Sequence, residues 1–362
     1  MRPYIEIDLN ALISNYLLLK AHVDRPLIAV IKANAYGHGA LPVCQALEAA
    51  GCEMVAVARS SEAVDLLAQP RQASILVLGV SDVDDLPTLI TAGVTLGVST
   101  AKEAKQIIDA AAKLGLRAKT HLKLDTGMRR LGALPSDAAA LADTLTNHTD
   151  LCGVYTHFAA ADEPCLDSAE QQYEQFNQLC NALSLSNNPN ICRHVANSAA
   201  TMLKPEWALD AVRPGIALYG SYPSEHVRAR CQQQLPLQTT LSVYSPISQQ
   251  KTLAAGDAVS YGGTWVAEHA TVIGHSQVGY GDGYMRHLSG KGQVSIDGRI
   301  YPIVGRVCMD QFAVNLGQTT DCKWMELLGK NVNIDDMASQ CATIGYEILT
   351  HLNSRLPRVY RR

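Results

Sequence analysis

A lysine directly follows a short apolar run near the start of the chain. The run Leu27–Ile31 is typical of a buried strand, and Lys32 stands at its C-terminal end. An amine in such a desolvated position is suited to react with a carbonyl group. Tyr36, Gly37 and Gly39 follow and offer a hydroxyl and open backbone to an anionic group. A strand-end lysine that reaches solvent beside an ordinary turn is the alternative interpretation.

Basic side chains also follow several later apolar runs. They lie in the segments Lys123–Arg130, Tyr155–His157, His194–Ser198 and Arg213–Ile216. If these runs are parallel strands of one barrel, their C-terminal ends meet at one mouth, where barrel enzymes place their active sites. Each segment alone has a plain structural explanation, but together they predict a cationic site at that mouth.

Two of these segments carry backbone amides suited to a phosphate group. Barrels often bind phosphate through backbone amides at their seventh and eighth strands, and Asn197-Ser198 and Gly215-Ile216 occupy those two places. Ser198 adds a hydroxyl donor. It is also a candidate N-cap for a short helix over 199–203, a role compatible with phosphate binding because both need exposed amides.

Apolar, β-branched runs alternate with helical stretches from Asn10 to about Ser221. About eight strand–helix units of this kind predict a (β/α)8 barrel. An open doubly wound sheet is the second choice, and the lack of an early G-x-G-x-x-G weakens its dinucleotide-binding form. The predicted strands are Leu27–Ile31, Met54–Ala58, Ser74–Leu78, Thr95–Ser99, Ala118–Leu124, Leu151–Phe158, Cys192–Ala196 and Ala211–Leu218, and the predicted helices include Ala40–Ala50, Ser61–Ala68, Thr100–Leu114, Ser136–Leu145 and Ser168–Leu183.

The pattern of apolar residues and glycines changes after Cys231. Short strands broken by glycines replace the helical periodicity, which indicates a second domain made mainly of β-strands. We therefore predict an α/β plus β fold, with the barrel at residues 1–234 and the β-rich domain at residues 235–362. Leu235-Pro236 is the expected linker. The alternating segment within residues 1–9 is a candidate strand for the sheet of the second domain.

Composition limits the classes of partner. The chain has 362 residues and a formal net charge of −4, which argues against nucleic acid or an anionic membrane as its main partner. None of the ten cysteines forms a C-x-x-C pair, so no zinc or redox motif is indicated, and we expect no metal. Acidic residues near the N-terminus do not suit a secretory signal, and no apolar run is long enough to span a membrane. We expect a cytoplasmic protein.

Nine sequence blocks, taken in order, resemble those of alanine racemases and cover nearly the whole chain. Several are specific on their own, and their shared order makes a chance match an unsatisfactory explanation. The resemblance implies a pyridoxal-phosphate barrel followed by a β domain, in a head-to-tail homodimer. The blocks are the N-terminal lysine motif, Lys123–Arg130, Thr156–Phe158, His194–Ser198, Arg213–Ile216, Val259–Tyr261, Gly279–Gly283, Val304–Gln311 and Tyr346-Glu347.

The resemblance also implies roles in binding pyridoxal phosphate. Lys32 matches the lysine that holds the cofactor covalently, and Arg213 matches the partner of its pyridine nitrogen. An arginine keeps its proton and therefore donates to an unprotonated ring nitrogen, whereas a carboxylate would strengthen the electron sink. Because the arginine limits the delocalisation of negative charge into the ring, side reactions such as transamination should be suppressed. The implied phosphate contacts are Tyr36, Ser198, Gly215, Ile216 and Tyr346.

Racemisation needs a proton to leave one face of a carbon and return to the other, so two bases on opposite faces are the simplest arrangement. The resemblance assigns them to Lys32 and to Tyr261 of the partner subunit. A tyrosine's ordinary pKa is about 10, so a base role requires a neighbour that lowers it, and His157 is the family's choice.

The substrate carboxylate has its own implied contacts. The resemblance assigns them to Arg130, whose fork can bind both oxygens, and to the backbone amide of Met309 from the partner. Lys123 matches a lysine that is often carbamylated and then steadies the arginine. Arg129 is expected to point to solvent. The remaining supporting residues are His157, His194, Asn197, Tyr280 and Asp310.

Several alternatives remain at this point. A related decarboxylase would carry a Gly-Glu-Pro-Gly-Arg-like loop and a Cys-Asp pair, neither of which occurs. A non-catalytic cofactor carrier would lack the β domain, and a phosphate-binding barrel without pyridoxal phosphate stays open on fold alone. The expected activity is interconversion of L- and D-alanine, supplying D-alanine for peptidoglycan. A racemase that prefers serine or another small amino acid is the alternative, and Tyr346 leaves little room for a larger side chain.

Overall fold

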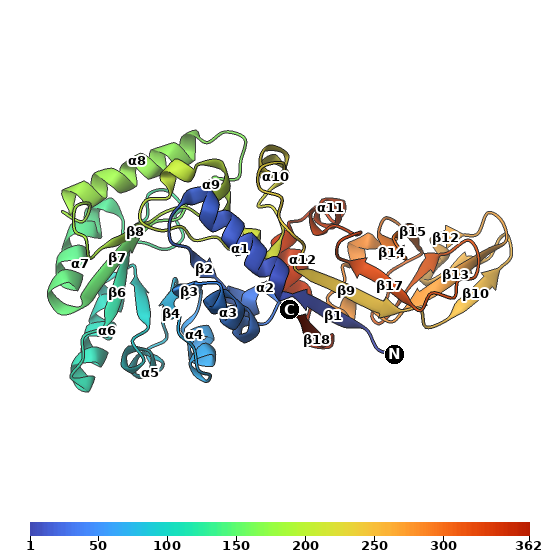
Figure 1. Ribbon diagram of the computed structural model, residues 1–362, viewed down its shortest axis with the longest axis horizontal. Coiled ribbons are helices and arrows are strands. Elements are labelled where there is room, and N and C mark those ends of the chain that lie inside the picture. The colour runs from blue at the N-terminus through green and yellow to red at the C-terminus, as the bar shows by residue number, and fades with distance from the viewer.

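The structure is a computed structural model that describes residues 1–362. Two parts lie side by side along the long axis of the molecule (Figure 1). One is a barrel of parallel strands surrounded by helices, and the other is a separate sheet with a few helices packed on it. The predicted fold class, a (β/α)8-type barrel with a mainly β-strand C-terminal part, is confirmed.

Seven parallel strands form the barrel sheet, and each pairs with the next strand in the sequence. Ile28 pairs with Met54, for example, and Val55 pairs with Ile75. Apolar side chains dominate these strands because both faces of the sheet are covered. The strands are β2 (Ile28–Val30), β3 (Met54–Val57), β4 (Ser74–Val77), β5 (Thr95–Val98), β6 (Lys119–Lys123), β7 (Asp150–Tyr155) and β8 (Cys192–His194).

The eighth predicted strand is wrong in its extent. Within Ala211–Leu218 only Val212 forms a bridge, with Leu27. Pro214 has no N–H to donate, and residues Ile216–Tyr219 form the 3-10 helix η2 instead of strand. The run is therefore too short to count as a strand.

That short segment nevertheless closes the barrel. The backbone N–H of Ile28 donates to the carbonyl of Val212 at 2.8 Å. On the other side, the N–H of Arg213 donates to the carbonyl of Ala196 at 2.8 Å. Residues 212–213 thus bridge the first and last strands of the barrel, which periodicity alone could not establish.

Helices cover the outside of the barrel, as Figure 1 shows. All five predicted helices are present with shifted ends. The helices are α1 (Leu9–Val23), α3 (Ala40–Ala49), α4 (Ser60–Leu67), α5 (Leu86–Thr91), α6 (Ala101–Leu114), α7 (Pro135–His148), α8 (Asp167–Ala182), α9 (Ser198–Leu203), η1 (Pro205–Trp207) and α10 (Glu225–Cys231). The segment α2 (Lys32–Tyr36), which follows β2, is a short turn with left-handed backbone.

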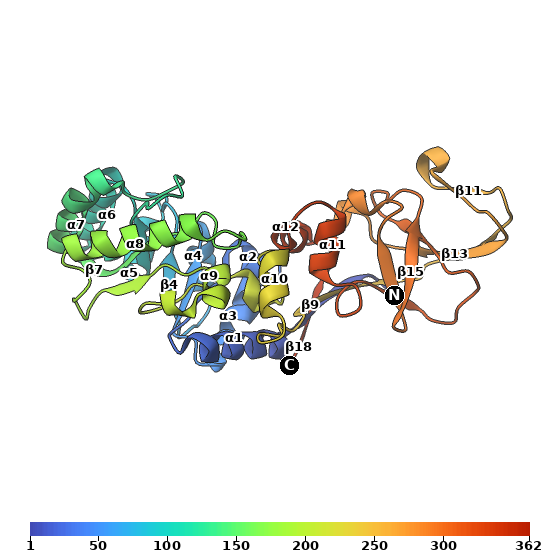
Figure 2. The same cartoon turned by 90° about the horizontal axis from the view of Figure 1, so that it is seen from above.

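The C-terminal part contains a nine-stranded sheet in the order β10-β13-β16-β15-β14-β17-β9-β1-β18. Strand β1 comes from the N-terminus and pairs antiparallel with β9 and parallel with β18. A separate pair, β11–β12, lies at the end of this part away from the barrel (Figures 1 and 2). The strands are β1 (Tyr4–Asp8), β9 (Leu241–Pro246), β10 (Gln250–Leu253), β11 (Ala258–Val259), β12 (Trp265–Val266), β13 (Thr271–Ser276), β14 (Gln293–Ile296), β15 (Arg299–Val304), β16 (Phe312–Asn315), β17 (Trp324–Leu328) and β18 (Arg358–Arg361).

Two helices near the end of the chain were not predicted. They are α11 (Ile334–Gln340) and α12 (Gly345–His351), and α12 lies between the barrel and the sheet (Figure 1). The 3-10 helices η3 (Tyr261–Gly263), η4 (Tyr280–Asp282) and η5 (Arg286–Leu288) interrupt the strands. One continuous cluster of buried apolar side chains joins the barrel to α12. Every helix falls short of the length and apolar character that a membrane-spanning segment needs.

Candidate active site

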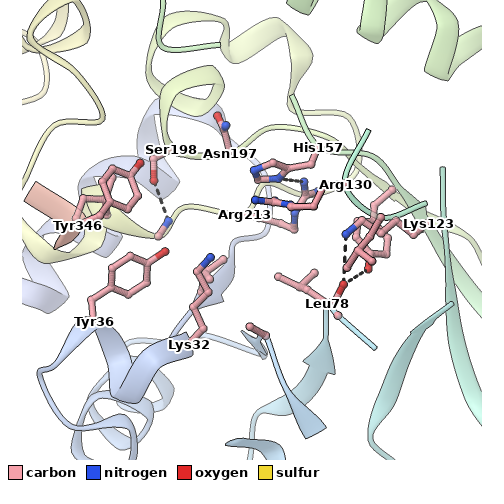
Figure 3. Close-up of a pocket in the computed structure, with 17 residues that line it drawn as sticks. Lys32, Tyr36, Leu78, Lys123, Arg130, His157, Asn197, Ser198, Arg213 and Tyr346 are labelled. Atoms are coloured by element: carbon pink, nitrogen blue, oxygen red, sulfur yellow. Dashed lines mark hydrogen bonds between the residues drawn. The ribbon is translucent and has the colours of Figure 1, made fainter. Parts of the chain in front are cut away.

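A cavity of about 320 Å³ opens at the C-terminal ends of the barrel strands. Its walls carry four cationic side chains and no carboxylate, so its electrostatics suit an anionic ligand. Figure 3 shows Lys32 pointing toward the middle, with Tyr36, Ser198 and Tyr346 to one side and Arg213, His157, Arg130 and Lys123 to the other. The lining residues are Val30, Lys32, Tyr36, Ala58, Leu78, Gly79, Lys123, Arg130, Leu131, Tyr155, His157, Asn197, Ser198, Arg213, Gly215, Ile216 and Tyr346.

Lys32 begins a turn of unusual backbone conformation. The four residues after it, Ala33 to Tyr36, all have φ between 51° and 54°, the left-handed region that side chains disfavour. Glu62 supports the turn, since its carboxylate accepts the N–H of Ala33 at 2.5 Å and the N–H of Ala58 at 2.8 Å. Burial, together with the charge of Arg130, lowers the pKa of the Lys32 amine, so it loses its proton more easily than a lysine in water.

Ser198, Gly215 and Tyr36 form a tight cradle on one side of the cavity. The N–H of Gly215 donates to the Ser198 hydroxyl at 2.8 Å. A Cβ at Gly215 would lie 2.4 Å from the Tyr36 hydroxyl, so any larger residue would force the Tyr36 ring to move. The ring of Tyr346 from α12 lies 6.1 Å from the ring of Tyr36. Hydroxyls and backbone here can surround a phosphate-sized anion.

Arg213 forms the centre of a buried polar network. Its four terminal N–H groups have protein acceptors, among them Thr156 O at 2.6 Å and Val195 O at 3.1 Å. One terminal nitrogen also donates to the Nδ1 and the carbonyl of His194 at 2.9 and 2.5 Å. The Nε–H is thus the one donor of Arg213 with no protein acceptor, which leaves it for a ligand atom.

The arginine fixes the tautomers of two histidines. His157 Nδ1 lies 3.4 Å from a terminal nitrogen of Arg213, and because arginine cannot accept, both this Nδ1 and that of His194 must be unprotonated. His157 therefore carries its proton on Nε2. His194 donates a hydrogen bond from its own Nε2–H to Nδ1 of His121, 2.9 Å away. Burial, reinforced by the positive charge of Arg213, lowers the pKa of all three rings, so they are neutral near pH 7.

Lys123 lies on the opposite side of the cavity from the cradle. Its Nζ is 3.5 Å from the carbonyl of Leu78 and 5.4 Å from the centre of the Tyr155 ring. Burial, aided by the charges of Arg213 and Arg130, lowers the pKa of Lys123 to about 8. A sizeable fraction of this amine is therefore neutral in mildly alkaline solution.

Sequence reasoning gave no role to Tyr155, His121 or Glu62. Tyr155 donates to Leu78 O at 2.8 Å and stacks on His194, with ring centres 5.0 Å apart. A signal for Glu62 was present, because a glutamate at the third position of a helix commonly accepts backbone N–H groups. No comparable pattern singles out the other two, whose roles depend on neighbouring strands.

Four predicted site residues lie away from this cavity in the same chain. Tyr261, Met309 and Asp310 line a second cavity of about 420 Å³ on the C-terminal part, and Tyr261 and Met309 are 72% and 53% exposed. Tyr280 is also exposed. Tyr261 begins η3, between β11 and β12, at the end of the molecule away from the barrel (Figure 2). A single chain therefore leaves these residues open to solvent.

The remaining predicted residues lie in or beside the barrel cavity. Asn197 lines it and caps α9 by accepting the N–H of Ala200 at 3.0 Å. His194 does not line it but bonds to Arg213. Arg129 points outward with its side chain 63% exposed, 3.9 Å from Asp125.

Fold and cavity together define a class of protein: a barrel enzyme with an added β domain, whose cationic barrel mouth suits an anionic ligand next to a desolvated lysine. The N-terminal domain model of alanine racemase matches residues 7–223, and its C-terminal domain model matches residues 240–360. The chain belongs to the alanine racemase family, whose members are amino-acid isomerases.

Individual relatives agree with this assignment. The alanine racemase of Desulforamulus reducens is 40% identical in an alignment of 366 positions that covers 99% of this chain and 98% of the relative. The structure of alanine racemase from D-cycloserine-producing Streptomyces lavendulae has a TM-score of 0.94 at 35% identity, covering 100% of this chain and 97% of that one. Alanine racemase from Bacillus anthracis with bound L-Ala-P has a TM-score of 0.91 at 33% identity, covering 100% and 95%.

Proposed function

We propose that this protein interconverts L-alanine and D-alanine with bound pyridoxal phosphate. The observation that carries the proposal is the cavity, in which a desolvated lysine faces an arginine with one free donor and a hydroxyl-lined cradle. The relatives, which are alanine racemases, point to the same substrate. Consistent with this, we propose that the protein works in the cytoplasm and supplies D-alanine for peptidoglycan.

The residues of the cavity suit pyridoxal phosphate at both of its ends. Gly215, Ser198, Ile216, Tyr36 and Tyr346 would hold the phosphate, in a cradle where a Cβ at the glycine would collide with a hydroxyl. At the other end the free Nε–H of Arg213 would donate to the pyridine nitrogen, and Lys32 would hold the aldehyde carbon covalently through Nζ. When bound, the cofactor supplies an electron sink for the charge left on the α-carbon.

Two bases then move the proton. Lys32 Nζ, whose pKa is lowered by burial, would be released when the amine of alanine takes its place on the cofactor, and it would then take or return the proton on one face of the α-carbon. On the other face we assign this role to Tyr261 of a second subunit. His157 Nε2, which carries a proton, would donate a hydrogen bond to the phenolic oxygen and stabilise its charged form.

Two further groups would orient the substrate. Arg130 would bind the carboxylate of alanine through its guanidinium fork, and the backbone amide of Met309 from the second subunit would bind it from the other side. Lys123, with its pKa lowered to about 8, has the neutral amine that reaction with carbon dioxide requires, so we propose carbamylation there. A carbamate would place a negative charge beside Arg130 and fix its orientation. Tyr280 and Asp310 would lie around the shared site.

The proposal includes a homodimer because one chain holds only part of this machinery. Tyr261 and Met309 are both exposed on the C-terminal part, and Tyr261 begins η3 at the end away from the barrel. Head-to-tail pairing by a twofold axis would bring each exposed patch to the barrel mouth of the other copy. Both sites would then contain residues from two chains.

Borohydride reduction tests the covalent step. The protein is incubated with pyridoxal phosphate, reduced, digested and mapped by mass spectrometry. We expect the pyridoxyl group on Lys32, and none on Lys123, whose amine serves as the internal control. Absence of the group from Lys32 would reject pyridoxal phosphate catalysis and favour a phosphate-binding barrel of another kind.

Racemisation assays in heavy water test the substrate. Each alanine enantiomer should lose its α-hydrogen to solvent and form its mirror image, while serine should react with a kcat/KM at least about tenfold lower because of the steric limit set by Tyr346. A higher kcat/KM for serine would overturn the choice of alanine and establish a serine racemase.

A further inference from the structure

The last strand of the chain reaches the turn that follows Lys32. In β18, Arg358 Nε donates to the carbonyl of Gly37 at 3.1 Å, and the Tyr360 hydroxyl donates to the carbonyl of His38 at 3.1 Å. Alternate residues of a strand share a face, so Arg358 and Tyr360 both point to the turn while Arg361 points away. Gly39 fits closely here too, because a Cβ on it would lie 2.1 Å from the Tyr360 hydroxyl.

The turn needs outside support because its backbone is strained. Four consecutive non-glycine residues, Ala33 to Tyr36, are left-handed, and such residues rarely follow one another. Its internal hydrogen bonds are short-range, from the N–H of Gly37 to Ala33 O at 3.0 Å and from the N–H of Gly39 to Asn34 O at 2.9 Å. One local side-chain contact supports this conformation, since Asn34 Oδ1 accepts the N–H of Ala40 at 2.8 Å, and contacts from elsewhere in the chain add to it.

Arg358 also holds the helix that carries Tyr346. One terminal nitrogen donates to Leu352 O, at the end of α12, at 2.7 Å. The other donates to the carbonyls of Asn353 and Leu356, the latter at 2.8 Å. The guanidinium has no carboxylate partner and bonds only to backbone carbonyls. One side chain thus joins the Lys32 turn to the end of α12.

We propose that Arg358, assisted by Tyr360, is a positioning residue that holds the Lys32–Tyr36 turn and α12 in register. Through it the C-terminal strand sets where Lys32 Nζ and the two tyrosine hydroxyls stand in the cavity. The inference rests on the proposed function for its effect on turnover, but its structural part stands independently of any reaction. Arg358 touches neither substrate nor cofactor and acts through the turn.

Hydrogen–deuterium exchange of the full-length protein, purified with pyridoxal phosphate, tests the structural part directly. In Arg358→Ala the amides of Gly37 and Gly39 should exchange about tenfold faster, the factor that corresponds to loss of about 1.4 kcal/mol. Tyr360→Phe removes only a hydroxyl and should give a smaller rise confined to the same amides. Arg358→Lys, which can reach fewer carbonyls at once, should fall between wild type and Arg358→Ala.

Arg361→Ala is the matched control. Arg361 lies on the same strand and pairs with Glu6 at 2.6 Å on the other face, so its loss should leave exchange in residues 33–39 unchanged. Faster exchange spread evenly over the barrel in Arg358→Ala, or equal exchange of the turn in Arg358→Ala and Arg361→Ala, would overturn the proposal.

Kinetics test its functional part. Arg358→Ala should lower kcat for alanine about tenfold and leave KM within about twofold, because the base is misplaced while Arg130 still binds the carboxylate. An unchanged kcat despite faster exchange of the turn would contradict the positioning role. If wild type itself has no racemase activity, the proposed function fails, whereas the exchange result still decides whether β18 holds the turn.

Discussion

The barrel cavity and the exposed patch of the C-terminal part contribute to the proposed reaction in opposite ways. In the barrel, Arg213 and Ser198 are each only 3% exposed and are fixed by several hydrogen bonds. On the patch, Tyr261 is 72% exposed and Met309 53%, and the Tyr261 side chain makes no hydrogen bond within the chain. The barrel cavity is thus ordered by contacts within one chain, whereas the patch around Tyr261 and Met309 is exposed and available to a second chain.

The difference between the two regions predicts that cofactor binding and catalytic turnover depend on different residues. A buried, hydrogen-bonded cavity can bind a cofactor without help, because its groups need no further ordering. Exposed groups contribute to catalysis only when a second surface excludes water and fixes their orientation. Changes in the barrel should therefore disturb cofactor binding, while changes on the patch should leave it intact and still stop the reaction.

The largest effect is expected for Lys32→Ala. It removes both the covalent attachment and one base, so kcat should fall by at least about 10⁴-fold. Cofactor should dissociate on gel filtration, which absorbance at its visible band measures. Retention of near-normal turnover would show that the lysine at the barrel mouth is not part of the reaction.

Tyr261→Phe should have the next largest effect and a different character. Turnover should fall about 10³-fold in both directions because one face of the α-carbon lacks its base. Cofactor absorbance and thermal stability should match wild type, since the hydroxyl is exposed in the chain itself. Loss of cofactor in this variant would break the contrast between the two regions.

The pH dependence of stability should report on the barrel region. Burial lowers the pKa of His38 from 6.5 to about 4, so an unfolded chain takes up this proton below pH 6.5 while the folded chain does not. Stability from this group is complete above pH 6.5 and is lost as the pH falls toward 4. At pH 5 the loss is about 2 kcal/mol relative to pH 7.5, at about 1.36 kcal/mol per pKa unit.

Urea unfolding of wild type and His38→Gln at the two pH values measures this difference. The variant should lose about 2 kcal/mol less than wild type on acidification, whatever its stability at pH 7.5. The control is a replacement of His275 on the C-terminal sheet. Because the His275 ring is only half-buried, this replacement should change the pH dependence of the free energy of unfolding less. If all three proteins lost the same free energy of unfolding between pH 7.5 and pH 5, His38 would not be the source of the pH dependence.

Arg130→Lys should have the smallest effect of the set. A lysine keeps the charge but cannot bind both carboxylate oxygens, so KM for alanine should rise about tenfold, or about 1.4 kcal/mol. Steady-state kinetics at several alanine concentrations measure this. A fall in kcat with an unchanged KM would assign Arg130 to another step.

The sequence was a good guide wherever a feature depends on local pattern. Runs such as Met54–Ala58 and Ser74–Leu78 became strands because their β-branched side chains suit a sheet covered on both faces. The cluster around Arg213 followed from the rule that parallel strands end at one mouth. No comparable rule predicts from the sequence where the second cavity, around Tyr261, lies relative to the barrel.

Features that depend on distant contacts were missed or misjudged. The left-handed turn after Lys32 contains no glycine at its four positions. Glu62 accepts a hydrogen bond from it, and Arg358 and Tyr360, from far along the chain, donate to the two residues that follow it. The eighth strand was predicted too long because the run Ala211–Leu218 is mostly apolar, although Pro214 within it has no N–H to donate to a neighbouring strand. Helix α12 was overlooked because its seven residues are too few for a helical period to show.

Complementation between two inactive variants tests the central claim, that each active site joins the barrel of one chain to the patch of another. Lys32→Ala and Tyr261→Phe are coexpressed and assayed together, with Lys32→Ala and Lys32→Gln as the control pair. Random pairing makes half of the dimers mixed, and each mixed dimer has one intact site, so activity should recover to about a quarter of wild type. The control pair should recover none. No recovery in the first pair, despite proven mixed dimers, would contradict the account.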